Sequence, residues 1–255
     1  MRFYRKTQKN YRVTNAGHSY NKRCPPWLLF LEIPFVFAKV ILPCNKQIRL
    51  LTIHIMFKEF IASQFKKPTG LFGMLTSNLM IKGNKSNYDI ILKDLDIQPY
   101  DKILEIGYGP GIGINMIAEK CNSCIVHGID FSKLMYKRAC NLNSKYIHDN
   151  KVSLVLGDFL TLTINSKDYD KVFCLNVVYF WNELLQPFEK IRSLLKTGGL
   201  FCFYMAHKDF LIKKKSPDKI FNKYSIEQVT EALTKTGFSR IDHYYNKGYY
   251  IKAEK

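Results

Sequence analysis

Three glycines at alternate positions, Gly107, Gly109 and Gly111, separate a short apolar run from a helical pattern in the stretch DKILEIGYGPGIGI. Glycine tolerates positive φ and lets a ligand approach the backbone closely. Free amides at the start of a helix attract anionic groups such as a carboxylate. One acid, Glu105, precedes the loop, and a second, Asp130, stands 23 residues after Gly107. This order of glycines and acids indicates a ligand site where a strand ends and a helix begins.

Two common nucleotide-binding fingerprints do not fit this loop. The dinucleotide fingerprint G-x-G-x-x-G needs a sixth-position glycine, but that position is Ile112 counting from Gly107 and Ile114 counting from Gly109. The phosphate loop G-x-x-x-x-G-K-[ST] fails as well, because Ile112 stands where its second glycine is required. The loop therefore indicates neither of these two ligand classes.

The elements that would position these residues alternate between strand and helix patterns from Met56 onward, which is typical of an α/β fold with a mostly parallel sheet. The sequence predicts a Rossmann-like, doubly wound, seven-stranded sheet, mostly parallel, with an antiparallel C-terminal hairpin around Asn246–Gly248. Strands are expected at 102–107, 124–130, 151–158, 170–180 and 200–206 and in the hairpin, and helices at 112–120, 132–146, 184–195 and 225–237.

The run from Glu105 to Gly111, EIGYGPG, resembles motif I of the class I S-adenosylmethionine (SAM) methyltransferases, E/D-x-G-x-G-x-G. Four further matches follow in order over about residues 102–252, and the closing hairpin agrees with the same fold. Local similarity is greatest to small-molecule methyltransferases, including the ubiquinone/menaquinone-biosynthesis type, in DFSKLM and NVVYFW. The four matches are Asp130 at the end of the second strand, Gly157-Asp158-Phe159 after the third, YDKVFCLNVVYFW at the fourth and LLKTGGLFCFYM at the fifth.

The resemblance implies SAM as the cofactor. It implies that Asp130 accepts hydrogen bonds from both ribose hydroxyls, that Asp158 lies near the adenine amino group, and that Glu105 lies near the methionine end. Ordinary turn roles remain open for Asp130, which Ser132 follows as a helix cap, and for Asp158 after Gly157. The expected cofactor-binding residues are Glu105, Gly107, Tyr108, Gly109, Gly111, Asp130, Phe131, Asp158, Phe159 and Asn176.

Methyl transfer from a sulfonium is an in-line displacement, so the protein mainly aligns donor and acceptor, and a base is needed only when the acceptor loses a proton. Tyr179 after the fourth strand and His207 after the fifth are the catalytic candidates, since ligands bind above the carboxyl ends of such strands. A solvent-exposed loop histidine remains the alternative for His207. The stretch from Asn176 to Tyr179 lacks both prolines of the N/D-P-P-Y signature and so argues against nucleobase amino methylation.

Seven cysteines are too few and too irregular for a disulfide-stapled small fold. Cys121 and Cys124 have C-x-x-C spacing, but no second Cys/His pair stands at zinc spacing from them, so no metal site is expected. We expect both to be free thiols, and Cys174 and Cys202 to be core residues. Free thiols fit a reducing, cytoplasmic location.

The net charge of +18 is unevenly distributed. Residues 1–55 contain ten Lys/Arg and one acid, Glu32, and so carry half of it. Their apolar run Trp27–Pro43 includes Glu32, Pro34 and Lys39, which argues against a membrane span. We expect residues 1–55 to be an extension outside the globular domain: a surface anchor, a failed signal-anchor or sequence foreign to the natural protein. The methyltransferase domain is expected at 56–255.

Within that domain, residues 56–100 are expected to form a glycine-rich, mobile lid or cap, and residues 101–255 the catalytic core. Six lysines between His207 and Tyr224 form a basic loop, which either is simply solvated or attracts an anionic acceptor. We expect the acceptor pocket between the segment 65–87, the segment 179–181 and this loop. Its aromatic and basic surroundings predict an amphipathic or anionic small-molecule acceptor.

The sequence therefore predicts a cytoplasmic SAM-dependent methyltransferase acting on a small molecule. An RNA or protein methyltransferase with the same cofactor site is the first alternative, and the basic charge favours it mildly. No OB, KH or RRM signature supports it, so nucleic acid is the less favoured partner. A module that binds SAM without turnover is the second alternative, against which the intact Glu105, glycines and Asp130 argue.

Overall fold

The computed structural model describes residues 44–165 and 167–255, with side chains from residue 55 onward. Most of the predicted extension, residues 1–43, lies outside the described residues. The described chain begins with helix α1 (Cys44–Lys66), which runs across the predicted boundary at Met56, and continues with α2 (Gly70–Asp94). None of the helices in this part of the chain is long and apolar enough to cross a bilayer.

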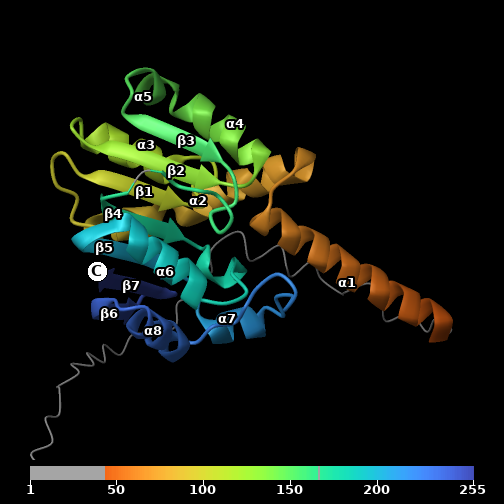
Figure 1. Ribbon diagram of the computed structural model, residues 1–255. Helices are drawn as coiled ribbons and strands as arrows, with labels where there is room; N and C mark the ends of the chain where they lie inside the picture. Colours follow the sequence, from red (N-terminus) through yellow and green to blue (C-terminus); the bar gives the residue numbers. More distant parts are fainter. Residues whose placement is uncertain (1–43, 166) are drawn as a thin grey trace, which may run out of the picture.

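A seven-stranded sheet forms the centre of the molecule (Figure 1). Its order is β3-β2-β1-β4-β5-β7-β6; the first five strands are parallel, and β7 pairs antiparallel with both β5 and β6. This confirms the predicted fold class, including the C-terminal hairpin. The strands are β1 (Lys102–Ile106), β2 (Ile125–Asp130), β3 (Val152–Leu156), β4 (Tyr169–Leu175), β5 (Leu195–Met205), β6 (Ser239–Tyr245) and β7 (Tyr249–Glu254).

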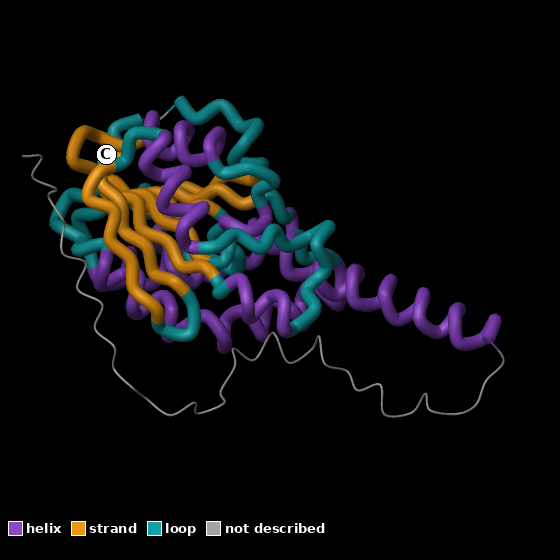
Figure 2. The backbone as a smooth tube through the Cα atoms, turned by 90° about the horizontal axis from the view of Figure 1, so that it is seen from below, coloured by secondary structure: helices purple, strands orange, loops and turns teal. Residues whose placement is uncertain are grey.

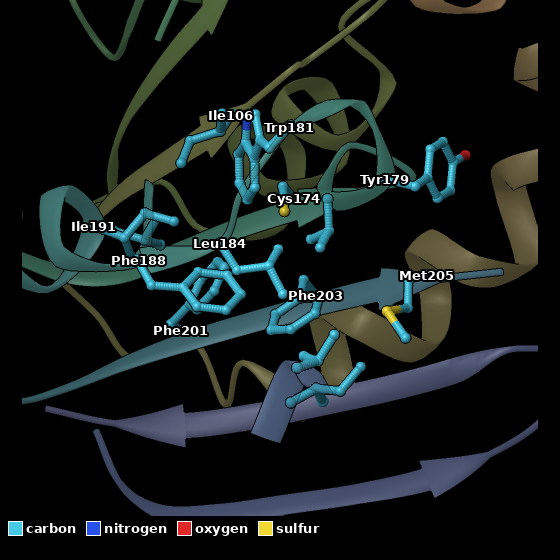
Figure 3. Close-up of a cluster of buried hydrophobic side chains, with 14 of the residues drawn as sticks. Ile106, Cys174, Tyr179, Trp181, Leu184, Phe188, Ile191, Phe201, Phe203 and Met205 are labelled. Atoms are coloured by element: carbon cyan, nitrogen blue, oxygen red, sulfur yellow. The ribbon is translucent and has the colours of Figure 1, made fainter. Parts of the chain in front are cut away.

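Helices cover both faces of this sheet (Figures 1 and 2). One apolar cluster joins β1, β4 and β5 to α6 (Leu185–Leu194) and α8 (Ile226–Lys235). Figure 3 shows Phe188 and Ile191 of α6 meeting Phe201 and Phe203 of β5 in this cluster. A second cluster on the other face joins the strands to α2, α3 (Ile112–Lys120) and α4 (Lys133–Leu142). The sheet is thus buried on both sides, as a doubly wound fold requires.

Local sequence explains where several elements begin and end. Ser132 caps α4 by accepting a hydrogen bond from the Met135 amide, and Ser225 with Gln228 forms a capping box at the start of α8. The helix expected over 132–146 is divided into α4 and α5 (Ser144–His148). Asn143 stands at the division, and its side-chain amide donates to the carbonyls of Gly111 and Ala139. A contact with the distant glycine loop therefore accompanies the break in the helix.

The segment 56–100, expected as a lid or cap, is mostly helical, and Gly70, Gly73 and Gly83 all lie in α2. Its role as a lid or cap stays a prediction. Two expectations need correction. The linker after β5 contains a short helix, α7 (Lys208–Lys213). Cys121 and Cys124 are joined by a disulfide rather than being free thiols. Their three-residue separation at the end of α3 brings the two Cα atoms within 5.4 Å, inside the range that a disulfide spans.

Candidate functional site

A cavity of about 360 Å³ opens above the carboxyl ends of β1 to β4. This is the edge of the sheet where ligands bind in doubly wound folds. Eight of the sequence-predicted site residues line it, which are Gly107, Gly109, Asp130, Phe131, Asp158, Phe159, Asn176 and Tyr179. Four others do not, which are Glu105, Tyr108, Gly111 and His207.

The Asp130 carboxylate occupies the end of β2 and is buried against the glycine loop. One of its oxygens accepts from the Gly109 amide at 2.9 Å, and the other accepts from the Ser132 amide at 2.8 Å. Burial raises the pKa of Asp130 to about 6, although both amide hydrogen bonds oppose the rise. Asp130 therefore has the turn role that its neighbour Ser132 suggested and also faces the cavity, where a carboxylate can accept from hydroxyl groups of a ligand.

The three loop glycines serve different purposes. All three have positive φ, which side chains rarely adopt. At Gly107 an added Cβ would lie 2.5 Å from a Val177 methyl, and at Gly111 it would lie 2.7 Å from the Asn143 amide. Both positions are thus small because the protein packs against them. At Gly109 an added Cβ would meet nothing closer than Met80 Cε at 3.9 Å, so it would project into the cavity. Gly109 keeps ligand space open.

Glu105 is fully buried beneath the loop and does not reach the cavity. One carboxyl oxygen accepts from the Tyr88 hydroxyl at 2.9 Å, and the other, Oε2, has no partner among the described residues. Desolvation raises its pKa to about 8. Gly113 of α3 packs against this carboxyl, where an added Cβ would lie 2.7 Å from Oε2. Glu105 therefore supports the glycine loop from below, packed between β1, α2 and α3.

Tyr108, predicted as a cofactor contact, also has a structural position, and it does not line the cavity. Its side chain is fully buried, and a Cβ on Gly128 would lie 2.6 Å from its ring. Its hydroxyl donates to the Val155 carbonyl at 3.3 Å. The ring therefore packs on β2 and β3, below the loop whose backbone faces the ligand space.

Asn176 at the end of β4 pairs with a residue that the sequence did not single out. Its side-chain amide donates to Asn84 Oδ1 of α2 at 3.1 Å, and both residues line the cavity. Asn176 adopts a φ of 61°, and its Oδ1 is buried without a hydrogen-bond partner among the described residues. A buried, unpartnered acceptor in a cavity wall suits a ligand that brings a donor.

Asp158 and Phe159 follow β3 at the cavity wall. Asp158 accepts from the Leu160 amide at 2.9 Å, so the turn role left open for it is observed, alongside its place in the wall. The Phe159 ring lies 6.2 Å from the Trp181 ring, and the two buried aromatics form an apolar wall. A flat, partly apolar group fits between such a wall and the acids of the site.

The aromatic segment after β4 forms the other wall. Tyr179 is buried and packs on Phe180 and Phe221, with ring centroids 4.7 and 5.3 Å away. Figure 3 shows its ring directed away from the Phe188–Phe201 cluster. Burial raises the pKa of Tyr179 well above its ordinary range, so the phenol keeps its proton at neutral pH. Tyr179 can donate a hydrogen bond to a ligand but is poorly suited to remove a proton.

His207 is not brought to this cavity. Its Nδ1 accepts from the Asp209 amide at 3.0 Å and caps α7, and its ring packs on Tyr249 and Tyr245 of the terminal hairpin. Strand β5, which precedes His207, is separated from β1 and its glycine loop by β4 and lies next to β7 of the hairpin. The structure therefore separates the two catalytic candidates and leaves Tyr179 alone at the cavity.

Residues of α1, of α2 and of the turn between them also line the cavity, and all of them lie within the segment 65–87 that was expected beside the acceptor. Lys66 donates to the Phe180 carbonyl at 3.3 Å, which ties the end of α1 to the aromatic segment. The Pro68 carbonyl accepts from the Ser132 hydroxyl at 2.8 Å. The sequence singled out the segment but not these individual side chains. The contributors are Phe65, Lys66, Pro68, Met80 and Asn84.

No group of His, Cys, Asp or Glu side chains among the described residues is arranged to hold a metal ion. The cavity instead combines the Asp130 and Asp158 carboxylates, the glycine loop and an aromatic wall. These are features for an organic ligand with hydroxyl and amino groups.

Comparison with known proteins indicates similarity to methyltransferases. A family model described as a methyltransferase domain matches residues 103–199. The methyltransferase YdaC of Bacillus subtilis is 28% identical over 169 residues, which cover 66% of this chain and 88% of that protein. The sterol 24-C-methyltransferase of Kluyveromyces lactis is 25% identical over 57% of this chain and 42% of its own length.

Among solved structures, the fold is similar to phosphoethanolamine N-methyltransferase 2 of Haemonchus contortus in complex with S-adenosyl-L-methionine. The TM-score is 0.55 at 24% identity, over 64% of this chain and 39% of that one. This chain thus spans less than half the length of the sterol and phosphoethanolamine enzymes that it resembles.

Proposed function

Because this chain belongs to the class I SAM-dependent methyltransferases, with SAM as cofactor, we propose that it transfers the SAM methyl group to a small-molecule acceptor bound in the cavity above β1 and β4. The observation that carries the proposal is the buried Asp130 carboxylate, held against the Gly109 amide at the cavity wall. SAM supplies an activated methyl group on a sulfonium. The chain's own task is to hold donor and acceptor in line.

The residues present fit this cofactor on three counts. Gly109 leaves open the space that a Cβ would fill. Asp130 offers carboxylate oxygens for ribose hydroxyls, and the Asn176 Oδ1 acceptor lacks a partner in the described structure and would suit an amino group. Phe159 and Trp181 offer an apolar wall for an aromatic base. We assign Gly107, Phe131 and Asp158 to the same cofactor-binding set.

We place the acceptor between α1, α2 and the segment 179–181, where Lys66, Met80 and Tyr179 line the cavity. The apolar side chains there suit a partly apolar molecule, and Lys66 suits an anionic group on it. The sterol and phosphoethanolamine specificities of the similar enzymes support a small-molecule acceptor. A cytoplasmic location remains part of the proposal: the free thiols Cys140, Cys174 and Cys202 support it, whereas the Cys121–Cys124 disulfide counts against a reducing compartment.

The cofactor assignment is tested by titrating SAM into Asp130→Ala by calorimetry. Loss of the hydrogen bonds to the carboxylate should weaken SAM binding by about tenfold to a hundredfold. Asp170→Ala is the matched control, because Asp170 also accepts a backbone amide, from Lys102, but lies outside the cavity. Equal SAM affinity of the two variants would remove Asp130 from the site, and tight NADH binding would contradict the cofactor.

The acceptor class is tested separately with methyl-labelled SAM and a cell extract. Label recovered in the small-molecule fraction would support the proposal. Label that becomes soluble only after nuclease or protease treatment would favour an RNA or protein acceptor instead. SAM binding with no labelled product in any fraction would favour a binding module without turnover.

A further inference from the structure

Exposed apolar side chains gather at the end of α1 and the start of α2. Of the large hydrophobic side chains that are exposed in the described structure, eight lie between residues 55 and 75. Leu71, Leu75 and Met56 are 78%, 63% and 64% exposed. We call this set the helical apolar surface, which comprises Ile55, Met56, Phe57, Phe60, Leu71, Phe72, Met74 and Leu75.

The two halves of the helical apolar surface are continuous. The Phe60 ring of α1 and the Phe72 ring of α2 meet edge to face, with centroids 5.3 Å apart. Helix α1 projects from the rest of the domain in two perpendicular views (Figures 1 and 2), and its apolar side chains at positions 55, 56, 57 and 60 are exposed. Clustered exposed apolar surface of this kind marks an interaction site.

The positive charge around the helical apolar surface indicates which kind of partner it binds. From Cys44 to Tyr88 the sequence contains seven Lys/Arg and a single acid, Glu59. Glu59 is itself neutralised by Lys219 of the basic loop, with 3.5 Å between the charged atoms, so the loop lies beside α1. A second copy of the chain would bring like charges together, whereas an anionic lipid surface would complement them.

We propose that the helical apolar surface docks this enzyme on anionic phospholipid bilayers, with its leucine, methionine and phenylalanine side chains in the acyl boundary and the flanking lysines at the headgroups. This is the arrangement of interfacial helices, which lie on a membrane without crossing it. Phe65 and Lys66 line the cavity and stand about one and a half turns beyond Phe60 on α1. Docking therefore brings the cavity close to the lipid. Uptake of an acceptor from the membrane rests on the proposed function, but docking does not.

The test is co-sedimentation of the full-length chain with vesicles of phosphatidylcholine alone or mixed with phosphatidylglycerol. We expect binding to the mixed vesicles that weakens with added salt, and much weaker binding to neutral ones. Leu71→Ser/Leu75→Ser should reduce binding by about tenfold or more, because two exposed leucines no longer enter the bilayer. Ile125→Ser/Leu142→Ser, which removes two exposed apolar side chains elsewhere, should not.

Met56→Ser on α1 is an independent variant of the same surface and should also reduce binding. Unchanged melting temperature and SAM affinity show that a variant is folded. Absence of vesicle binding, equal binding of the leucine variant and the wild type, or equal binding to neutral vesicles would each overturn the proposal. So would a wild-type dimer that the leucine variant abolishes in sedimentation velocity, because a second copy would then cover the surface.

Discussion

Glu105 shows how one residue of a recognition motif supports a site without touching the ligand space. Its carboxyl lies between the Tyr88 hydroxyl and Gly113, with one oxygen unpartnered within the described structure. Burial raises its pKa to about 8, so at neutral pH it is mostly a neutral acid. A neutral acid can remain under the glycine loop without the cost of a buried charge.

This position makes stability depend on pH. Between pH 4.5 and about 8 the folded protein keeps a proton on Glu105 that the unfolded chain has lost. The free energy of unfolding therefore falls as pH rises through this window. Glu105→Gln should flatten the dependence by on the order of 3–5 kcal/mol between the two ends. Urea unfolding at several pH values measures it, and Glu119→Gln, on the exposed side of α3, is the control. An unchanged slope in the Gln variant would contradict the burial of a neutral acid.

Tyr179 and His207 give a second prediction at this scale. The Tyr179 phenol lies at the cavity with a raised pKa, so its loss should remove a positioning contact rather than a base. Tyr179→Phe should lower kcat about tenfold and leave SAM affinity nearly unchanged. His207→Ala should have a smaller effect, because its ring packs on the hairpin. Both effects are measured as kcat with the acceptor that the labelling experiment identifies. A loss of about a hundredfold or more in His207→Ala would restore it as a general base.

Among the elements, the junction of β1 and α3 depends on close packing with α4. Gly111 begins α3 with a φ of 85°, and its carbonyl accepts from the Asn143 side chain. An added Cβ would lie 2.8 Å from Ala139 Cβ. The loop thus needs glycine here for two reasons, a backbone conformation and a lack of space.

Two variants separate these reasons. Gly198 also has positive φ, at 76°, but an added Cβ there would meet nothing within 4 Å. Gly198→Ala should therefore lose about 1–2 kcal/mol of unfolding free energy from backbone conformation alone. Gly111→Ala should lose about 1–3 kcal/mol more, from overpacking against α4. Urea denaturation compares them, and equal losses would show that the α3–α4 contact adjusts without cost.

For the whole molecule, the domain boundary predicted at Met56 remains a prediction. Among the described side chains of α1, from residue 55 onward, Ala62 and Phe65 join the core, whereas Met56, Phe57 and Phe60 are exposed. A chain that starts at Met56 should therefore keep the melting temperature and the SAM affinity of the full chain. Thermal denaturation and calorimetry test this. A drop of many degrees would show that residues before Met56 pack on the domain.

Features encoded by neighbouring residues could be predicted from the sequence alone. Strand and helix order follows from apolar periodicity, the hairpin from its turn residues, and the glycine loop with Asp130 from spacing along two adjacent strands. The order of parallel strands then brings their carboxyl ends together, which explains why eight predicted site residues share one cavity. The long helix α2 was not apparent from its glycines, because packing against the sheet outweighs the low helix propensity of glycine.

Only the tertiary structure decided which distant residues meet. Asn84 reaches Asn176 across 92 residues, and Tyr88 reaches Glu105, because α2 lies over the carboxyl ends of β1 and β4. The same packing turns Tyr108 and Glu105 away from the cavity, and the position of β5 in the sheet keeps His207 out of it. Spacing in a sequence reports local geometry. Which face a side chain takes, and how far it is buried, depends on contacts between elements that no local pattern records.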